Sequence, residues 1–172
     1  MNLEYRHLLP ADFDPLSRVW IYQGSRPFSL SEVLTVEDML NGFSQQWHAH
    51  GSGVKNFATV FFGQFIVLMA DETHTHVSGC STDSSVRMIK EIEKQFNLSL
   101  FNRQMLAFVV KDKIQVLPMN QLAYAVENNF ITADTLYFNN TVLTKKEMEN
   151  NWLIKVKDSW LAGKITFPAV AS

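Results

Sequence analysis

The sequence predicts an α+β fold, with a largely antiparallel or mixed sheet of about five to six strands and three to four helices packed on it. Two kinds of pattern predict this class. Short runs of β-branched and aromatic residues are separated by turn residues, which is typical of hairpins. Other stretches repeat apolar residues at helical spacing. Since the 172 residues contain no internal repeat or linker, we expect a single globular domain over residues 1–172.

The first predicted elements are a strand at residues 18–23 (RVWIYQ) and a helix after it. The helix can begin at Ser29, which has Glu32 three residues later, or at the equivalent pair Thr35 and Asp38. Its apolar residues then recur at helical spacing up to residue 47. The glycines at positions 51 and 53 are expected to end it.

A hairpin is predicted next, from residues 56–62 (NFATVFF) and 65–70 (FIVLMA). The pair Gly63-Gln64 suits a two-residue type II′ turn, because glycine tolerates its first position. The second strand is apolar on both faces, which favours a central place in the sheet.

The second half of the chain predicts a helix at residues 82–96, a hairpin around the turn at 111–113, a short helix at 119–129 and a strand at 135–138. Thr144 and Glu147 have the spacing of a capping box and predict one more helix. The apolar stripe of the 82–96 helix is expected to consist of Val86, Ile89, Ile92 and Phe96.

Charge and hydropathy exclude several classes of function. The net charge is −2 and no basic stripe stands out, so we expect no nucleic-acid partner. The longest apolar stretch, at residues 57–70, is about two-thirds of a membrane span. The first residues lack a signal-peptide pattern. We therefore expect a cytoplasmic protein without a membrane span.

The segment FIVLMADETHTHVSGCSTDSS, residues 65–85, imitates a nucleotide hydrolase. Asp71-Glu72 after an apolar strand resembles a Walker B motif, and VSGCS resembles the signature of transporter ATPases. Phosphate binding, however, needs a loop of pattern G-x-x-x-x-G-K-[ST], which the chain lacks. We expect neither ATP hydrolysis nor a bound cofactor.

Four stretches together, RVWIYQGSRPF, FIVLMADE, SGCSTDSSVRMIKEIE and TLYFNN, resemble a family of small uncharacterised Bacteroidetes proteins that are often labelled "ABC transporter ATPase". The resemblance spans nearly the whole chain. It implies a family of unknown function without an established activity, so no catalytic residue is carried over from it. The label matches the two imitations in residues 65–85.

A second resemblance covers about Leu106 to Val156. A hairpin, a short helix, NNFITADTLYF and the later Trp152 are similar to small GYF-type adaptor modules, which bind proline-rich or other peptides. The glycine and tryptophan usual around the final strand are replaced by Asn139-Asn140. This resemblance implies a peptide-binding module.

Cys80, the single cysteine, lies just before the predicted helix start at Thr82-Asp83. A helix N-terminus stabilises a thiolate, and His74 or His76 could serve as its base, so a cysteine-dependent enzyme is one hypothesis. The alternative is that Cys80 is a small buried apolar residue.

The pairs His74/His76 and His48/His50 suggest metal ligands. Cys80 or Asp71 could add a ligand to the first pair, whereas the second pair closes a helix C-terminus, where the helix dipole favours histidine. Zinc sites usually need three or four ligands at set spacing, and the set here is incomplete. We therefore assign no metal and interpret these histidines as solvent-exposed.

A surplus of hydroxyl groups surrounds the same helix start, and a helix N-terminus can hold a phosphate or carboxylate. Some of these residues are expected only to cap the helix, with Asp83 as one candidate N-cap and Ser81 or Thr82 as the alternatives. The candidate ligand-binding residues are Ser78, Gly79, Ser81, Thr82, Asp83, Ser84 and Ser85.

The preferred hypothesis is a non-enzymatic module that binds a small anionic ligand or a peptide near Gly79–Ser85. The alternative is an enzyme that uses Cys80 with His74 or His76.

Overall fold

The structure of the protein is a computed structural model that describes residues 1–49 and 53–169. The predicted α+β class is confirmed. The helices are Leu30–Ala49 (α1), Gly79–Phe96 (α2), Leu122–Glu127 (α3) and Lys145–Asn151 (α4). The strands are Arg18–Gln23 (β1), Lys55–Phe61 (β2), Phe65–Asp71 (β3), Met105–Val110 (β4), Lys113–Pro118 (β5), Leu136–Phe138 (β6) and Leu153–Lys155 (β7).

Among the described residues, the strands form two antiparallel sheets rather than one, with three strands in the first sheet and four in the second. Each sheet belongs to a compact unit of its own. The N-terminal unit comprises residues 2–102 and 142–149, and the C-terminal unit comprises residue 1, residues 103–141 and the chain from residue 150 onward.

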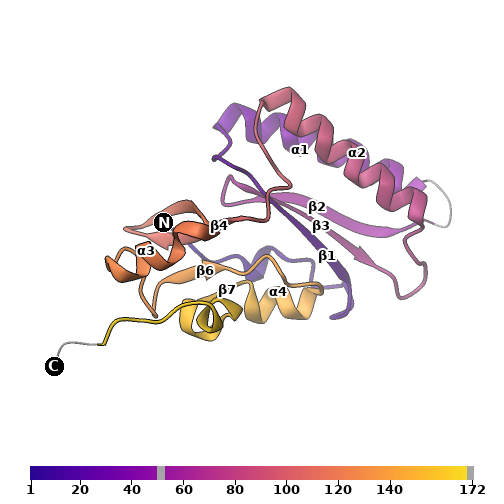
Figure 1. Ribbon diagram of the computed structural model, residues 1–172. Coiled ribbons are helices and arrows are strands. Elements are labelled where there is room, and N and C mark those ends of the chain that lie inside the picture. The colour runs from indigo at the N-terminus through magenta and orange to yellow at the C-terminus, as the bar shows by residue number, and fades with distance from the viewer. Residues whose placement is uncertain (50–52, 170–172) are drawn as a thin grey trace. The chain divides into compact units, whose positions relative to one another are not determined.

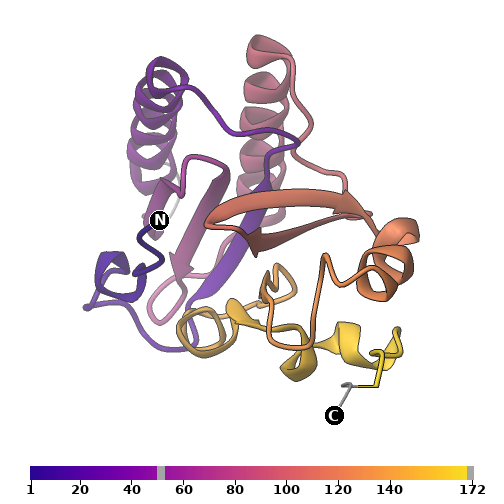
Figure 2. The ribbon, with the colours of Figure 1, turned by 90° about the vertical axis from the view of Figure 1, so that its left-hand side faces the viewer.

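The sheet of the N-terminal unit has the order β1-β3-β2. Every residue of β3 is buried, which confirms its predicted central place in the sheet. A central place suits this strand because it carries apolar side chains on both faces. Helices α1 and α2 run side by side in opposite directions over one face of this sheet (Figures 1 and 2). The core between the helices and the sheet includes Val36, Leu40, Ile66, Leu68, Ile89 and Ile92.

The β2–β3 hairpin differs from the prediction by one residue. Phe61 pairs with Phe65, and the positive φ angles fall at Phe62 (54°) and Gly63 (62°). Two successive positive φ angles are typical of a type I′ turn, so the predicted type II′ turn at Gly63-Gln64 is wrong. The ring of Phe62 packs edge-on against Tyr5 and Phe65, which compensates for a left-handed backbone at a bulky residue.

Helix α1 begins at the first of the two predicted positions. The Glu32 N–H donates to Ser29 Oγ at 3.2 Å, and the Ser29 N–H donates to Glu32 Oε2 at 2.8 Å, which is a complete capping box. Arg26 also holds Glu32 through both carboxylate oxygens. The predicted helix end at Gly51 lies outside the described residues, whereas Gly53 has a φ of 66°.

The C-terminal unit has the sheet order β5-β4-β6-β7. The predicted hairpin is confirmed, with Lys111 and Asp112 at positive φ between β4 and β5. Helix α3 follows β5 after the 3₁₀ turn at Met119–Gln121 and packs Leu122, Ala125 and Val126 against the sheet residues Leu106, Phe108 and Leu117. Strand β7 was not predicted, because three residues are too short to show a period.

The segment of residues 142–149 lies between β6 and β7 in the chain but belongs to the N-terminal unit. Thr144 and Glu147 cap its helix as predicted, with the Glu147 N–H donating to Thr144 Oγ1. The Val19 N–H donates to the Leu143 carbonyl, and the Tyr5 hydroxyl donates to the Met148 carbonyl at 2.6 Å. The N-terminal unit is therefore built from two separate stretches of chain.

Candidate functional site

Helix α2 begins at Gly79, three residues before the predicted start. Ser78 has an extended backbone, and its Oγ accepts the N–H of Ser81 at 3.1 Å, so Ser78 is the N-cap. The candidate N-caps Asp83, Ser81 and Thr82 are all wrong, because the three residues lie inside the helix. Trp47 of α1 fixes this end of α2 by donating from Nε1 to the Ser81 carbonyl at 3.2 Å.

Most hydroxyls of the predicted anion site are bonded to the helix itself. Thr82 Oγ1 donates to the Ser78 carbonyl, Ser84 Oγ to the Cys80 carbonyl and Ser85 Oγ to the Thr82 carbonyl. Hydroxyls inside helices commonly form such bonds one turn back. The geometry thus explains these side chains without a ligand, and Ser85 is buried at 2% exposure.

Cys80 is exposed, so the alternative interpretation of a small buried apolar residue is wrong. His74 and His76 are exposed in the loop before the helix. His76 lies 4.0 Å from Glu72, and across residues 1–49 and 53–169 no hydrogen bond or ion pair joins Cys80 to either histidine. The structure does not assemble the nucleophile and base that the enzyme hypothesis requires.

The two acids of the Walker-B-like stretch organise the loop that leads to α2. Asp71 is buried and accepts the N–H groups of Asp14 and Thr73, as well as the Thr73 hydroxyl. These bonds, led by the one from the Thr73 hydroxyl, lower the pKa of Asp71 to about 2. Glu72 accepts the N–H of Val77 at 3.0 Å and pairs with Arg18 at 3.2 Å. Both carboxylates thus have structural partners within the chain.

The histidine pairs do not gather further ligands. Within the part of the chain that the structure describes, no three His, Cys, Asp or Glu side chains lie close enough together to hold a metal ion. His48 is exposed at the end of α1, and His50 lies outside the described residues.

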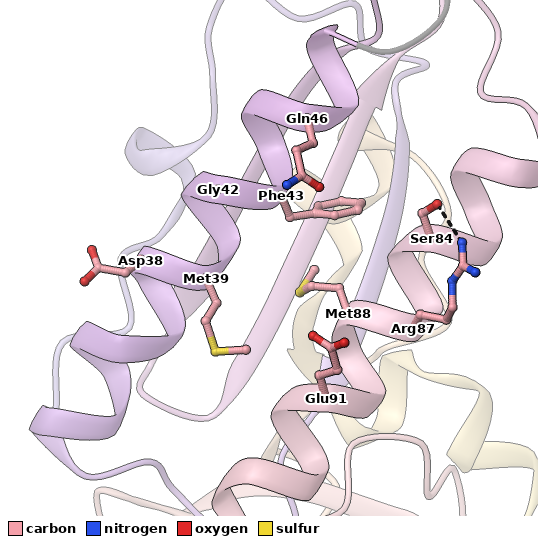
Figure 3. A pocket seen from close by; sticks show the side chains of 9 residues that line it. All are labelled: Asp38, Met39, Gly42, Phe43, Gln46, Ser84, Arg87, Met88 and Glu91. Atoms are coloured by element: carbon pink, nitrogen blue, oxygen red, sulfur yellow. Dashed lines mark hydrogen bonds between the residues drawn. The ribbon is translucent and has the colours of Figure 1, made fainter.

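A groove of about 450 Å³ runs between α1 and α2 and includes one residue of the predicted site, Ser84. Its apolar side chains, Met39, Phe43 and Met88, point between the two helices (Figure 3). Its polar and charged lining is Asp38, Gln46, Ser84, Arg87 and Glu91. We call this surface the α1–α2 groove.

The two ends of the α1–α2 groove differ in their lining residues. Gln46 and Ser84 lie toward one end, and Met39 and Glu91 toward the other (Figure 3). The guanidinium of Arg87 donates to Ser84 Oγ at 3.2 Å and forms no ion pair with the residues described. The end nearest the start of α2 therefore presents a cation with hydrogen-bonding groups beside an apolar floor.

Because Gly42 has no side chain, it leaves the α1 side of this groove open. A Cβ atom at Gly42 would meet nothing within 4 Å, so packing does not require a glycine there. Glycine in a helix interior costs roughly 1 kcal/mol relative to alanine. Gly42, Met39 and Arg87 were not predicted, because a groove depends on the spacing of two helices and apolar periodicity does not report that spacing. The glycine at a mid-helix position was the available signal in the sequence.

No family model, curated protein or solved structure matches this chain. None of the helices among the described residues has the length and apolar character needed to cross a membrane.

Proposed function

We propose that this protein is a non-catalytic binding module. Its ligand, a small molecule or a peptide segment, carries an anionic group next to an apolar body and occupies the α1–α2 groove. The observation that carries this proposal is the groove of about 450 Å³, which joins the apolar side chains of Met39, Phe43 and Met88 to Arg87 and Ser84. Volumes of this order are typical of small-molecule sites.

The position of the anionic group follows from the charges of the groove. Arg87 and Ser84 supply donors at the start of α2, whereas Asp38 and Glu91 on the lining would repel an anion. The ligand's anion is therefore placed against Arg87, and its apolar body against Met88 and Phe43. This arrangement keeps the predicted preference for an anion but moves it from the helix N-terminus to the side of α2.

Three probes that differ only in their head group test this proposal: 4-phenylbutyrate, 4-phenylbutanol and 4-phenylbutylamine. In amide-resolved NMR titrations we expect the carboxylate to bind tightest, with shifts centred on Phe43, Ser84 and Arg87. Arg87→Gln should remove the preference for the carboxylate. Gly42→Phe should block all three probes, because Gly42 lines the groove, a Cβ there meets no neighbour within 4 Å, and the added ring would occupy the probe's space.

Lys90→Gln is the matched control, since it removes one positive charge from the exposed surface of the same helix outside the groove lining. Equal shifts for all three head groups, or shifts that persist in Gly42→Phe, would refute the proposed ligand and its site.

The alternative hypothesis, a cysteine-dependent enzyme, can be tested directly because the Cys80 thiol is exposed. A catalytic thiol would react with iodoacetamide faster than a free thiol at neutral pH, because its thiolate is stabilised. Without a base bonded to Cys80, we expect the rate of a free thiol, unchanged in His74→Ala and His76→Ala. A rate at least about tenfold higher that either substitution lowers would favour the enzyme.

A further inference from the structure

Strand β5 forms one edge of the sheet in the C-terminal unit, since the strand order is β5-β4-β6-β7. It has six residues, twice as many as β7 at the other edge. An edge strand of this length offers a row of backbone groups to which another strand can pair.

The register shows which backbone groups point outward. A two-residue turn with positive φ at Lys111 and Asp112 makes Val110 and Lys113 a hydrogen-bonded pair. Because hydrogen-bonded and non-hydrogen-bonded pairs alternate, the N–H and C=O groups of Ile114 and Val116 face away from β4. Among the residues described, no other backbone group bonds to them.

An apolar groove lies beside this edge. It has a volume of about 280 Å³, and its lining consists of Leu117, Gln121, Tyr124, Ala125, Asn128 and Phe130. Leu117 and Ala125 are buried, whereas Tyr124 is 71% exposed and Phe130 is 46% exposed. Aromatic side chains left this open beside an apolar depression are typical of interaction surfaces.

We propose that β5 and this groove together bind an extended segment of a partner protein as an added strand. The segment pairs with the outward backbone groups of Ile114 and Val116 and places an apolar side chain in the groove. This mode of recognition combines main-chain hydrogen bonds with pockets for alternate side chains. The site lies in the C-terminal unit and is independent of the function proposed for the α1–α2 groove.

Charge complementarity defines the partner further. Side chains alternate along a strand, so Lys113 shares a face of β5 with Leu117, four residues away. Lys113 is exposed and forms no ion pair with the described part of the chain. Suppose that an apolar residue of the bound segment enters the groove beside Leu117. The residue four positions along the segment then lies against Lys113, where Asp or Glu is favoured.

A second copy of this chain fits the edge less well. Two β5 strands paired antiparallel about Gln115 would place Lys113 of each copy opposite Leu117 of the other. A lysine against an apolar residue forgoes both the ion pair and the apolar contact. The exposed Lys113 therefore favours an acidic segment of a different protein over a second copy paired in this register.

Selection from a random dodecapeptide display library on the full-length protein tests this proposal. We expect enriched peptides with an apolar residue and an Asp or Glu four positions apart. Selection on Lys113→Glu should replace the acidic residue by Lys or Arg. For one enriched peptide, Lys113→Glu should weaken binding about fivefold, and Tyr124→Ser at least about as much.

Lys90→Gln, in the other unit, is the control for loss of a positive charge and should leave binding unchanged. Lys113 and Tyr124 are both exposed, so their variants are expected to fold. No enrichment, self-association in place of peptide binding, or enriched proline-rich peptides indifferent to Lys113 would each overturn the proposal.

Amide hydrogen exchange provides the second measurement. On binding, the amides of Ile114 and Val116 should exchange at least roughly tenfold more slowly. The amides of Gln115 and Leu117, which already face β4, should change little. Unchanged exchange at Ile114 and Val116 in the saturated complex would show that the peptide does not add a strand.

Discussion

Ser78 is the residue on which the start of α2 depends. Its Oγ accepts the Ser81 N–H, so Ser78→Ala leaves this donor without its cap. We expect a loss of about 1 kcal/mol in the free energy of unfolding, measured by urea denaturation. Asp83→Ala is the comparison variant and should change stability by less than about 0.5 kcal/mol. The reverse order of the two effects would restore Asp83 as the cap.

Asp71 makes the stability of the fold dependent on acid. Its folded-state pKa is lowered from 3.8 to about 2, so its contribution is complete above pH 4 and disappears as the pH falls toward 2. We expect Asp71→Asn to lower stability by roughly 2 kcal/mol at pH 7, because bonds to a charged acceptor are lost. Between pH 4 and pH 2 this variant should lose less further stability than the wild type.

The control for this pH series is Asp83→Asn, which removes an exposed carboxylate from a nearby helix. Between pH 4 and pH 2, Asp71→Asn should lose less stability than Asp83→Asn, because only the first substitution removes the carboxylate whose pKa is lowered to about 2. The pKa of Glu32 is also lowered to about 2, mainly by its hydrogen bonds with Arg26. Part of the loss of stability between pH 4 and pH 2 therefore remains in every variant.

For individual residues, the sequence predicted where polar side chains cluster but not which groups they form hydrogen bonds with. The predicted capping box of Ser29 and Glu32 is local and was correct. Asp71 instead bonds to the N–H of Asp14, 57 residues earlier, which no local pattern indicates. Serine is as good an N-cap as aspartate, so residue preference alone does not distinguish Ser78 from Asp83.

At the scale of the secondary-structure elements, Gly42 makes α1 less stable than an alanine at the same position would. Gly42→Ala should raise the free energy of unfolding by about 1 kcal/mol, because alanine is the better helix former and its Cβ meets no neighbour. Thermal unfolding measures this gain. Gly163→Ala, at another open glycine outside α1, is the comparison. A destabilised Gly42→Ala would mean that Gly42 is needed by the fold and not by the groove.

Helices and long strands were predicted well, because their apolar periods reflect which face is buried. The buried residues of α2 include the predicted Ile89 and Ile92 but also Met88, while Val86 and Phe96 are only half-buried. The α1–α2 groove was not predictable in this way. It exists because the residues between the two buried stripes do not fill the space between the helices.

For the whole molecule, the sequence predicted the class of fold but one sheet instead of two. Which strands pair is decided by contacts far apart in the chain, and the pairing of β6 with β7 spans the inserted residues 142–149. Hairpins are local, and both predicted hairpins were found.

The N-terminal unit should not fold stably as a fragment of residues 1–102. Such a fragment lacks Val142 and Met148, which are buried, and the carbonyl groups that accept from Tyr5 and Val19. Loss of a buried methionine side chain alone costs about 2–5 kcal/mol, a large part of the stability of a typical domain. Circular dichroism and thermal melting of the fragment measure the effect.

The matched variant joins residues 1–102 to residues 142–149 through a flexible Gly/Ser linker and should recover a cooperative transition. A fragment of residues 1–102 that melts like the intact protein would contradict the expectation.

The same inserted segment governs when the protein can fold during its synthesis. The ribosome completes Asn102 about 40 residues before it begins the stretch from Val142 to Glu149, which corresponds to roughly two to eight seconds of elongation. During that interval the apolar strands β2 and β3 have been made, but the helix that completes their unit has not. The nascent chain therefore exposes part of its first core to other nascent chains, and we expect its yield in cells to depend on chaperones and on the speed of translation between codons 103 and 149.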